Sequence, residues 1–133
     1  MAPVEVLLVE DNAGDALLAS QMLADAPVPV KLHIARDGAQ ALHMLSGEQL
    51  KPDVVILDLN LPEIDGLRVM EQYHPADVPI VVFSSSTRES DKLLAKALGA
   101  CEYIVKPSDL DAFRDAIWGM VQRWGSRRSR EKV

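Results

Sequence analysis

Blocks of apolar residues recur along this chain, and five of them have the length and composition that predict β-strands. They cover residues 4–9, 28–35, 53–57, 80–83 and 101–105. Most of these runs are rich in Val, Ile and Leu and nearly continuous, which is typical of strands buried on both faces of a sheet. The run at 28–35 is more polar, so we expect that strand to be half-buried.

The segments between and after these runs carry apolar residues three and four positions apart, which predicts amphipathic helices. They cover residues 13–23, 37–45, 66–73, 87–98 and 108–124. Asn12 is expected to cap the first helix, and Gly99 to end the fourth. In the last helix, Trp118 and Val121 lie off the main apolar stripe, where exposure would mark a partner or dimer surface. The stripe, which we expect to face the core, comprises Leu110, Phe113, Ile117, Met120 and Trp124.

A strand followed by a helix, repeated five times, predicts βαβ units with right-handed crossovers. The expected fold class is therefore α/β, with a five-stranded parallel sheet covered by helices on both faces. A chain of 133 residues is long enough for one domain with a substantial core. We expect this domain to cover residues 1–124, and the polar, basic residues 125–133 to form a frayed tail with no further domain after it.

Charge and composition exclude several classes of protein. The net charge of −6 argues against general nucleic-acid binding. Glu5, Glu10 and Asp11 interrupt the first apolar run, so it lacks the form of a signal peptide, and no run approaches the ~20 residues of a membrane span. The single Cys101 excludes an internal disulfide, and we expect it to be a small buried side chain. These features indicate a cytoplasmic protein that binds neither nucleic acid nor membrane.

Polar clusters begin where four of the apolar runs stop. If the strands are parallel neighbours, their carboxyl ends bring Glu10, Asp11, Asp58, Ser84 and Lys106 to one edge of the sheet. Carboxylates held this close repel one another, and a hard divalent cation would remove that repulsion. Oxygen ligands favour Mg²⁺, and the sequence has no Cys/His cluster that would favour zinc.

The remaining side chains of this edge suit a phosphoryl group. Lys106 adds a point charge for a phosphate oxygen, and Ser84 adds a small hydroxyl donor. Phosphoryl transfer depends mainly on positioning and charge neutralisation, and Asp58 can supply a nucleophile by forming an acyl phosphate. Its strand is the most apolar and is expected to be central. The pattern therefore predicts a metal-assisted, phosphoryl-accepting site.

From about residue 4 to residue 124, the chain resembles the receiver domain of two-component response regulators. The resemblance rests on five ordered features, which together are specific although each alone is weak. They are Glu10-Asp11, Asp58, the stretch LNLPEIDG at 59–66, Ser84, and Lys106-Pro107. The resemblance implies a CheY-like, flavodoxin-like sheet with strand order 2-1-3-4-5.

The resemblance also implies roles for individual residues. Asp58 would be the phosphoacceptor, contacted after phosphorylation by Lys106 and Ser84, and Tyr103 would be the aromatic switch residue that follows Ser84. Asn60 and Ser86 would tune the lifetime of the phosphoryl group, and the bond between Lys106 and Pro107 would be cis. The ligands of Mg²⁺ would be Glu10, Asp11, Asp58 and the main-chain carbonyl of Asn60. Such a domain catalyses only its own phosphorylation and dephosphorylation, and is not an enzyme acting on other substrates.

Three stretches are similar to stand-alone receivers that serve bacterial phytochrome-type histidine kinases, which implies such a kinase as the partner. They are VEDNAGDALL, HIARDGAQALHML and Ser84-Ser85-Ser86. Two departures from many receivers leave the reaction rates open. Glu10 replaces a common Asp and extends that carboxylate by a methylene, and Ser84 replaces a common Thr, which leaves the switch hydroxyl less restricted.

Several outputs and rival functions stay open at this point. The signal could leave by contact with an unidentified target, by passing the phosphoryl group onward in a phosphorelay, or by homodimerisation through the fourth helix, fifth strand and fifth helix. Asp58-x-Asn60 faintly resembles the haloacid-dehalogenase motif of Asp-nucleophile phosphatases, but that class places its nucleophile after the first strand. A flavodoxin-like flavin binder would need a Gly/Ser/Thr-rich phosphate loop, which is absent after the first run. A receiver-like module regulated only by binding would not need the complete acidic, hydroxyl and lysine set.

Overall fold

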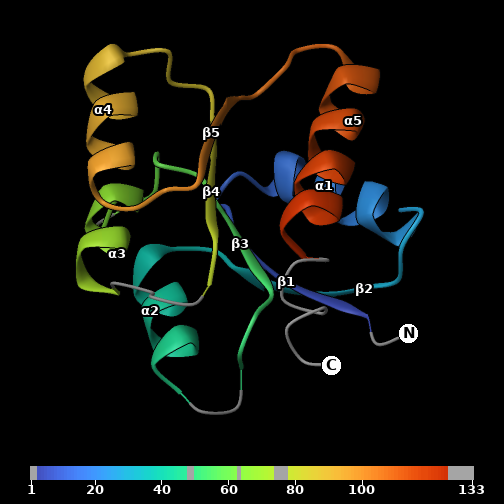
Figure 1. Cartoon of the computed structure of the whole chain (residues 1–133), viewed down its shortest axis with the longest axis horizontal. Coiled ribbons are helices and arrows are strands. Elements are labelled where there is room, and N and C mark those ends of the chain that lie inside the picture. The colour runs from blue at the N-terminus through green and yellow to red at the C-terminus, as the bar shows by residue number, and fades with distance from the viewer. Residues whose placement is uncertain (1–2, 48–49, 63, 74–77, 126–133) are drawn as a thin grey trace.

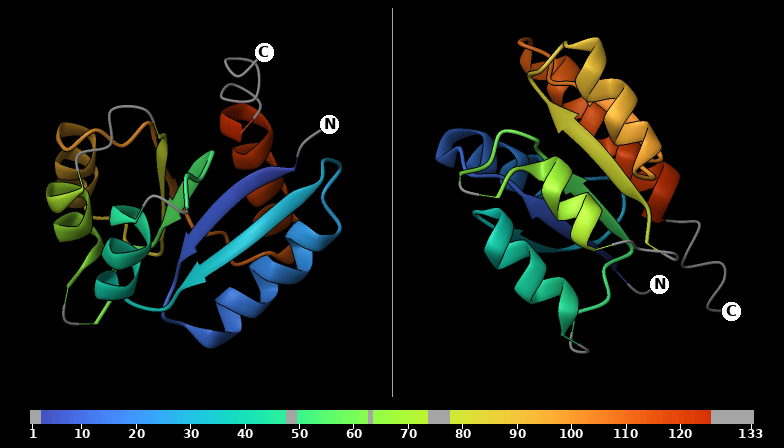
Figure 2. Two further views of the ribbon diagram at one scale, coloured as in Figure 1. Left: turned by 90° about the horizontal axis from the view of Figure 1, so that it is seen from below. Right: turned by 90° about the vertical axis from the view of Figure 1, so that its left-hand side faces the viewer.

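The computed structural model describes residues 3–47, 50–62, 64–73 and 78–125. Its centre is a five-stranded parallel sheet in the order β2-β1-β3-β4-β5, with the strands running the same way (Figures 1 and 2). The predicted fold class and strand order are confirmed. The strands are β1 (Val4–Val9), β2 (Val30–Ala35), β3 (Val54–Leu57), β4 (Ile80–Ser84) and β5 (Glu102–Val105).

Five helices cover the two faces of this sheet. Helices α1 and α5 lie on one face, and α2, α3 and α4 on the other (Figure 1). Each predicted helix is present, with ends shifted by one or two residues except in α5, whose last turn is a π-type turn, η1 (Val121–Gly125). The helices are α1 (Ala13–Ala24), α2 (Gly38–Ser46), α3 (Gly66–Gln72), α4 (Glu89–Ala97) and α5 (Leu110–Met120).

The apolar runs are continuous because the sheet has a core on each side. In β1, Leu7 and Val9 belong to the core beneath α2, α3 and α4, whereas Val6 and Leu8 belong to the core beneath α1 and α5. Strand side chains alternate between faces, so both sets must be apolar when both faces are covered. The edge strand β2 is mostly half-buried, as predicted.

Capping side chains fix where most of the helices begin. Asn12 accepts a hydrogen bond from the backbone N–H of Asp15, which confirms it as the cap of α1. Asp37, Asp65 and Asp109 cap α2, α3 and α5 in the same way. Helix α4 follows Arg88, whose side chain makes no capping hydrogen bond. Each helix follows a strand of the parallel sheet, so its start lies near the carboxyl edge, where the candidate site lies.

Two predictions about burial are wrong, those for Leu110 and Cys101, and Val121, whose exposure the sequence left open, is buried. Leu110 is 61% exposed because it opens α5 at the rim of the sheet, although Phe113, Ile117 and Met120 are buried as expected. Val121 is 1% exposed, because it stands four residues after Ile117 and so faces the core with it. Cys101 is exposed, since it precedes β5 at the opposite edge of the sheet, where its Sγ donates to the carbonyl of Ile80 at 3.2 Å.

The last part of the chain concerns the exposure of Trp118 and the expected tail at residues 125–133. Trp118, whose exposure the sequence left open, is half-buried, and its Nε1–H donates to the carbonyl of Met22 in α1 at 2.8 Å. Gly125 is buried in the final turn against Val4, and residues 126–133, the rest of the expected tail, lie outside the described residues. Within the part of the chain that the structure describes, no helix has the length and apolar character needed to cross a lipid bilayer.

Candidate functional site

The candidate site is built where the sheet ladder ends. The backbone N–H of Glu10 donates to Ala35 at 2.9 Å, that of Asp58 donates to Val9 at 3.0 Å, and that of Lys106 donates to Ser84 at 2.8 Å. Each of these three residues follows its strand directly and makes one further backbone hydrogen bond of the parallel-sheet type to the neighbouring strand. The side chains therefore start from fixed backbone positions at one edge of the sheet.

This edge holds an acidic cluster of three residues. Carboxylate oxygens of Glu10, Asp11 and Asp58 lie within 4.8 Å of one another. Glu10 and Asp58 are buried, whereas Asp11 is exposed. One oxygen of Asp58 accepts the backbone N–H of Asn60 at 3.1 Å, and one oxygen of Glu10 accepts the backbone N–H of Asn12 at 3.2 Å. The structure thus brings together the three carboxylates that the sequence pattern placed at this edge.

Lys106 reaches into this cluster from the end of β5. Its ammonium lies 2.5 Å from Glu10 Oε1 and 3.0 Å from Asp58 Oδ2. It also lies 2.9 Å from Oδ2 of Asp15, in the first turn of α1. Sequence reasoning missed Asp15, although its spacing from Asn12 carried a signal: a residue three positions after an N-cap lies in the first helical turn, close to the sheet edge.

Burial and neighbouring charges alter the protonation of two of these groups. Burial raises the pKa of Glu10 to about 7, because the ion pair with Lys106 offsets only part of that effect and the nearby Asp58 adds to it. Burial alone would lower the pKa of Lys106, but hydrogen bonds to Glu10 and Asp15 and the charge of Asp58 outweigh it. The net effect raises the pKa of Lys106, so this side chain is a permanent cation in the site.

The donor set fits a hard divalent cation. The cluster offers oxygen atoms only, from the ends of two adjacent strands, and Lys106 does not neutralise all of its carboxylates. Mg²⁺ and similar ions take such oxygen ligands, whereas structural zinc sites favour Cys and His. Burial raises the pKa of Glu10 and the nearby Asp58 adds to that effect, so a cation bound between these carboxylates would favour their ionised forms.

The expected switch residues lie on β4, β5 and the loop after β4. Ser84 is completely buried, and its Oγ accepts the backbone N–H of Ser86 at 3.2 Å. The hydroxyl of Ser86 donates to Asp91 of α4 at 2.5 Å, and the hydroxyl of Tyr103 donates to the carbonyl of Ser86 at 2.9 Å. The hydroxyls of Ser84 and Tyr103 are therefore joined through the backbone of Ser86. Sequence reasoning named these residues but not these bonds.

Two further expectations concern Asn60 and the turn after β5. Asn60 is exposed and stands two residues after Asp58, with its backbone N–H donating to the Asp58 carboxylate. The expected cis bond between Lys106 and Pro107 is wrong for this structure, because no cis peptide bond occurs among the described residues.

We expect binding of Mg²⁺ to release protons near neutral pH. A carboxyl with a pKa of about 7 is half-protonated at pH 7, and only its ionised form binds a cation. Apparent affinity should rise between about pH 6 and pH 8 and then level off. Calorimetric titrations in two buffers of different ionisation enthalpy count the protons released, and Glu10→Gln should abolish the release. An equal proton count in that variant would assign the titration to another group.

Comparison with known proteins identifies the family. Residues 6–118 match the response regulator receiver domain. Response regulator Rcp1 of Synechocystis is 30% identical over 131 residues, which cover 92% of this chain and 89% of Rcp1. A protein-glutamate methylesterase/protein-glutamine glutaminase of Symbiobacterium thermophilum is 38% identical over 111 residues, 80% of this chain. This chain spans about a third of the length of the curated methylesterases that it matches, so the similarity carries no esterase activity to it.

Solved structures agree with that match. The phosphorylated cyanobacterial phytochrome response regulator RcpA superposes with a TM-score of 0.85 and 34% identity, covering 92% of this chain and 94% of RcpA. The Mn²⁺-bound form of Rcp1 gives 0.82 and 32% identity, covering 92% and 95%. The bacteriophytochrome response regulator AtBRR gives 0.70 and 32% identity, covering 90% and 95%. The chain therefore belongs to the response regulator receiver domain family of two-component signalling.

Proposed function

We propose that this chain is a phosphorylation switch in which Asp58 accepts a phosphoryl group from a histidine kinase. The observation that carries the proposal is the buried Asp58 carboxylate, held by the backbone N–H of Asn60 and by Lys106 inside an acidic cluster. In the reaction, a bond forms between a carboxylate oxygen of Asp58 and phosphorus. The bond between phosphorus and the imidazole nitrogen of the kinase histidine breaks.

The residues around Asp58 divide the remaining tasks. Glu10, Asp11, Asp58 and the main-chain carbonyl of Asn60 would hold Mg²⁺, which when bound neutralises charge on the transferring group. Lys106 supplies a second positive charge, and Ser84 a hydroxyl donor, for the phosphoryl oxygens. Asn60 and Ser86, which stand two residues after Asp58 and Ser84, would tune the lifetime of the phosphoryl group.

Phosphorylation would act on the protein surface through the bonds of the loop after β4. When Ser84 turns its hydroxyl toward a phosphoryl oxygen, it leaves the N–H of Ser86, whose carbonyl also holds Tyr103. The equilibrium between conformations of the surface formed by α4, β5 and α5 would then shift. Helix α4 carries two exposed leucines, Leu93 and Leu94, which suit a homodimer or an unidentified target protein.

The partner proposed here is a phytochrome-type histidine kinase, because the similar solved structures include phytochrome-associated response regulators. A cytoplasmic location follows from such a partner. The net charge of −6 disfavours nucleic acid as a target. The chain would catalyse only its own phosphorylation and dephosphorylation. The rival phosphatase finds no support in the topology, because Asp58 follows β3 rather than β1.

Beryllofluoride, which mimics a phosphoryl group on Asp, tests the proposal. We expect it to bind only with Mg²⁺ present, and the mass measured by light scattering to double on binding. Leu93→Glu and Leu94→Glu should retain binding and prevent the doubling. The matched control is Leu17→Glu, since Leu17 is equally exposed (60%) but lies on α1.

The outcomes separate the two parts of the proposal. Failure to bind with Mg²⁺ would overturn the phosphoacceptor site. Binding without a change of mass would leave the site standing and exclude the homodimer. In that case the signal would leave through another protein or by onward transfer of the phosphoryl group.

A further inference from the structure

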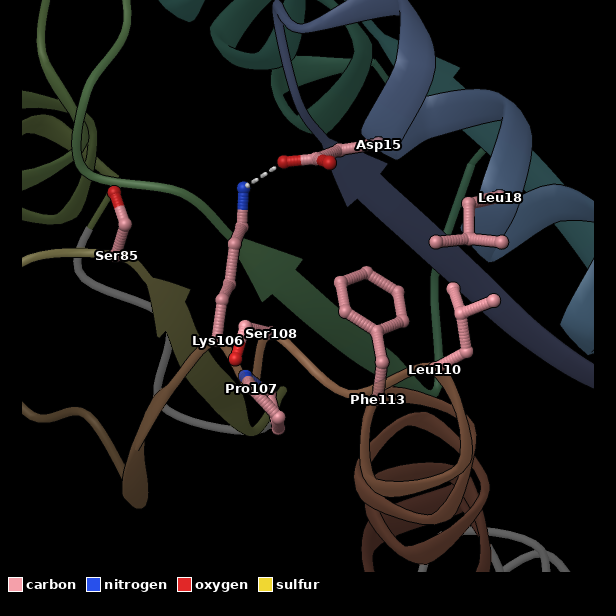
Figure 3. Close-up of a pocket in the computed structure, with 8 residues that line it drawn as sticks. All are labelled: Asp15, Leu18, Ser85, Lys106, Pro107, Ser108, Leu110 and Phe113. Atoms are coloured by element: carbon pink, nitrogen blue, oxygen red, sulfur yellow. Dashed lines mark hydrogen bonds and ion pairs between the residues drawn. The ribbon is translucent and has the colours of Figure 1, made fainter.

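Asp15 contacts Lys106 without belonging to the acidic cluster that would hold a metal. Its Oδ2 lies 2.9 Å from the ammonium of Lys106, as the dashed line in Figure 3 shows. The cluster itself comprises Glu10, Asp11 and Asp58. Asp15 and Lys106 also line a pocket of about 320 Å³ between α1 and the segment that leads from β5 into α5. Asp15 therefore approaches Lys106 from the open side of the site.

The start of α1 fixes the position of Asp15. Asn12 accepts the backbone N–H of Asp15 at 2.9 Å, so Asp15 is held in the first turn of the helix. Side chains of a helix lean toward its N-terminus, which here lies at the carboxyl edge of the sheet. The carboxylate of Asp15 is thereby directed back over the site, whereas its neighbour Leu18 lines the apolar part of the pocket (Figure 3).

The contacts of Lys106 use its full donor capacity. A lysine ammonium has three N–H donors, and the structure gives it three carboxylate partners: Glu10 at 2.5 Å, Asp15 at 2.9 Å and Asp58 at 3.0 Å. A phosphoryl oxygen on Asp58 can therefore receive a hydrogen bond from Lys106 only if one of these partners gives way.

Asp15 is the partner that can be released at the lowest cost. Its side chain is 37% exposed, against 4% for Glu10 and 7% for Asp58. A released Asp15 is hydrated by solvent, and Asp15 is not among the residues that would hold Mg²⁺, so a bound cation does not itself release Asp15 from Lys106. Removing the Asp15 charge should therefore make Lys106 more available to a phosphoryl group.

We propose that Asp15 is a positioning residue that holds Lys106 in its resting place and competes with the phosphoryl group for it. The inference rests on the proposed function of Asp58. Asp15 touches neither Asp58 nor the transferred group in this scheme, and acts through Lys106. Asp15 thereby lowers the affinity of the site for a phosphoryl group.

The test measures the Kd of beryllofluoride at saturating Mg²⁺ by fluorine NMR. We expect Asp15→Asn to lower the Kd about fivefold, as suits the loss of a partly exposed ion pair. Asp15→Glu, which keeps the charge, should stay within about twofold of the unmodified protein. The matched control is Asp25→Asn, the same change at the exposed far end of α1.

Two further measurements distinguish competition for Lys106 from repulsion of the anion at a distance. The effect of Asp15→Asn should persist at high salt, since contact pairs are screened less than distant charges. It should disappear in a Lys106→Met background, because Asp15 then has no partner through which to act. An effect that survives Lys106→Met, or an unchanged Kd in Asp15→Asn, would overturn the inference. Failure of the unmodified protein to bind beryllofluoride would instead count against the proposed function.

Discussion

Asp58→Asn is expected to abolish acyl-phosphate labelling by acetyl phosphate. The amide has nearly the shape of the carboxylate and can still accept the backbone N–H of Asn60 through its oxygen. It has no anionic oxygen to attack phosphorus, and an amide nitrogen is a poor nucleophile. Removing one of three clustered carboxylates also relieves repulsion, so the variant should remain folded. Labelling is measured by mass spectrometry of the intact protein in the presence of Mg²⁺.

Asp53→Asn is the matched control for this experiment. Asp53 is equally buried and precedes the same strand, but at the opposite edge of the sheet, where it accepts the backbone N–H of Glu5 at 2.9 Å. Its replacement should leave labelling intact. Undiminished labelling of Asp58→Asn would exclude Asp58 as the phosphoacceptor, and a thermal melt shows whether either variant has lost its fold.

The fold and the acidic cluster could be predicted because both follow from local patterns. A continuous apolar run followed by an amphipathic segment specifies a buried parallel strand and its covering helix. Once the strands are parallel neighbours, the residues after them must meet at one edge, which is why Glu10, Asp11 and Asp58 lie together. The strand order came from resemblance, since the pattern alone does not say which strands are adjacent.

The contacts that were missed depend on side-chain direction rather than on pattern. Asp15 reaches Lys106, ninety-one positions away, only because the Asn12 cap sets the start of α1. The bond between Ser86 and Asp91 likewise depends on how the loop after β4 enters α4. Exposure at the ends of elements was also misjudged, as Leu110 and Cys101 show. The apolar pattern indicates which face of a helix or strand a residue lies on. At the end of a helix or strand, neighbouring elements no longer cover that face, so an apolar residue there can be exposed.

The turn after β3 is as important to the site as the charged residues, because it places Asp58. The backbone N–H of Gly66, the first residue of α3, donates to the carbonyl of Leu59 at 3.0 Å. The chain closes so tightly there that a Cβ on Gly66 would lie 2.6 Å from the carbonyl oxygen of Asp58 and 2.7 Å from Cα of Leu59. Both are main-chain atoms, so no side-chain rotation can relieve the clash.

Gly66→Ala is therefore expected to lower the free energy of unfolding by about 3 kcal/mol, the upper range for an overpacked interior. It should also weaken binding of beryllofluoride with Mg²⁺, because the backbone that must move carries Asp58. Gly47→Ala is the matched control, since its Cβ would meet nothing closer than 3.9 Å. Urea unfolding gives the stabilities, and titration of the folded protein gives the affinities. If Gly66→Ala matched the control in both, the turn would be free to adjust, and the position of Asp58 would not depend on its close packing.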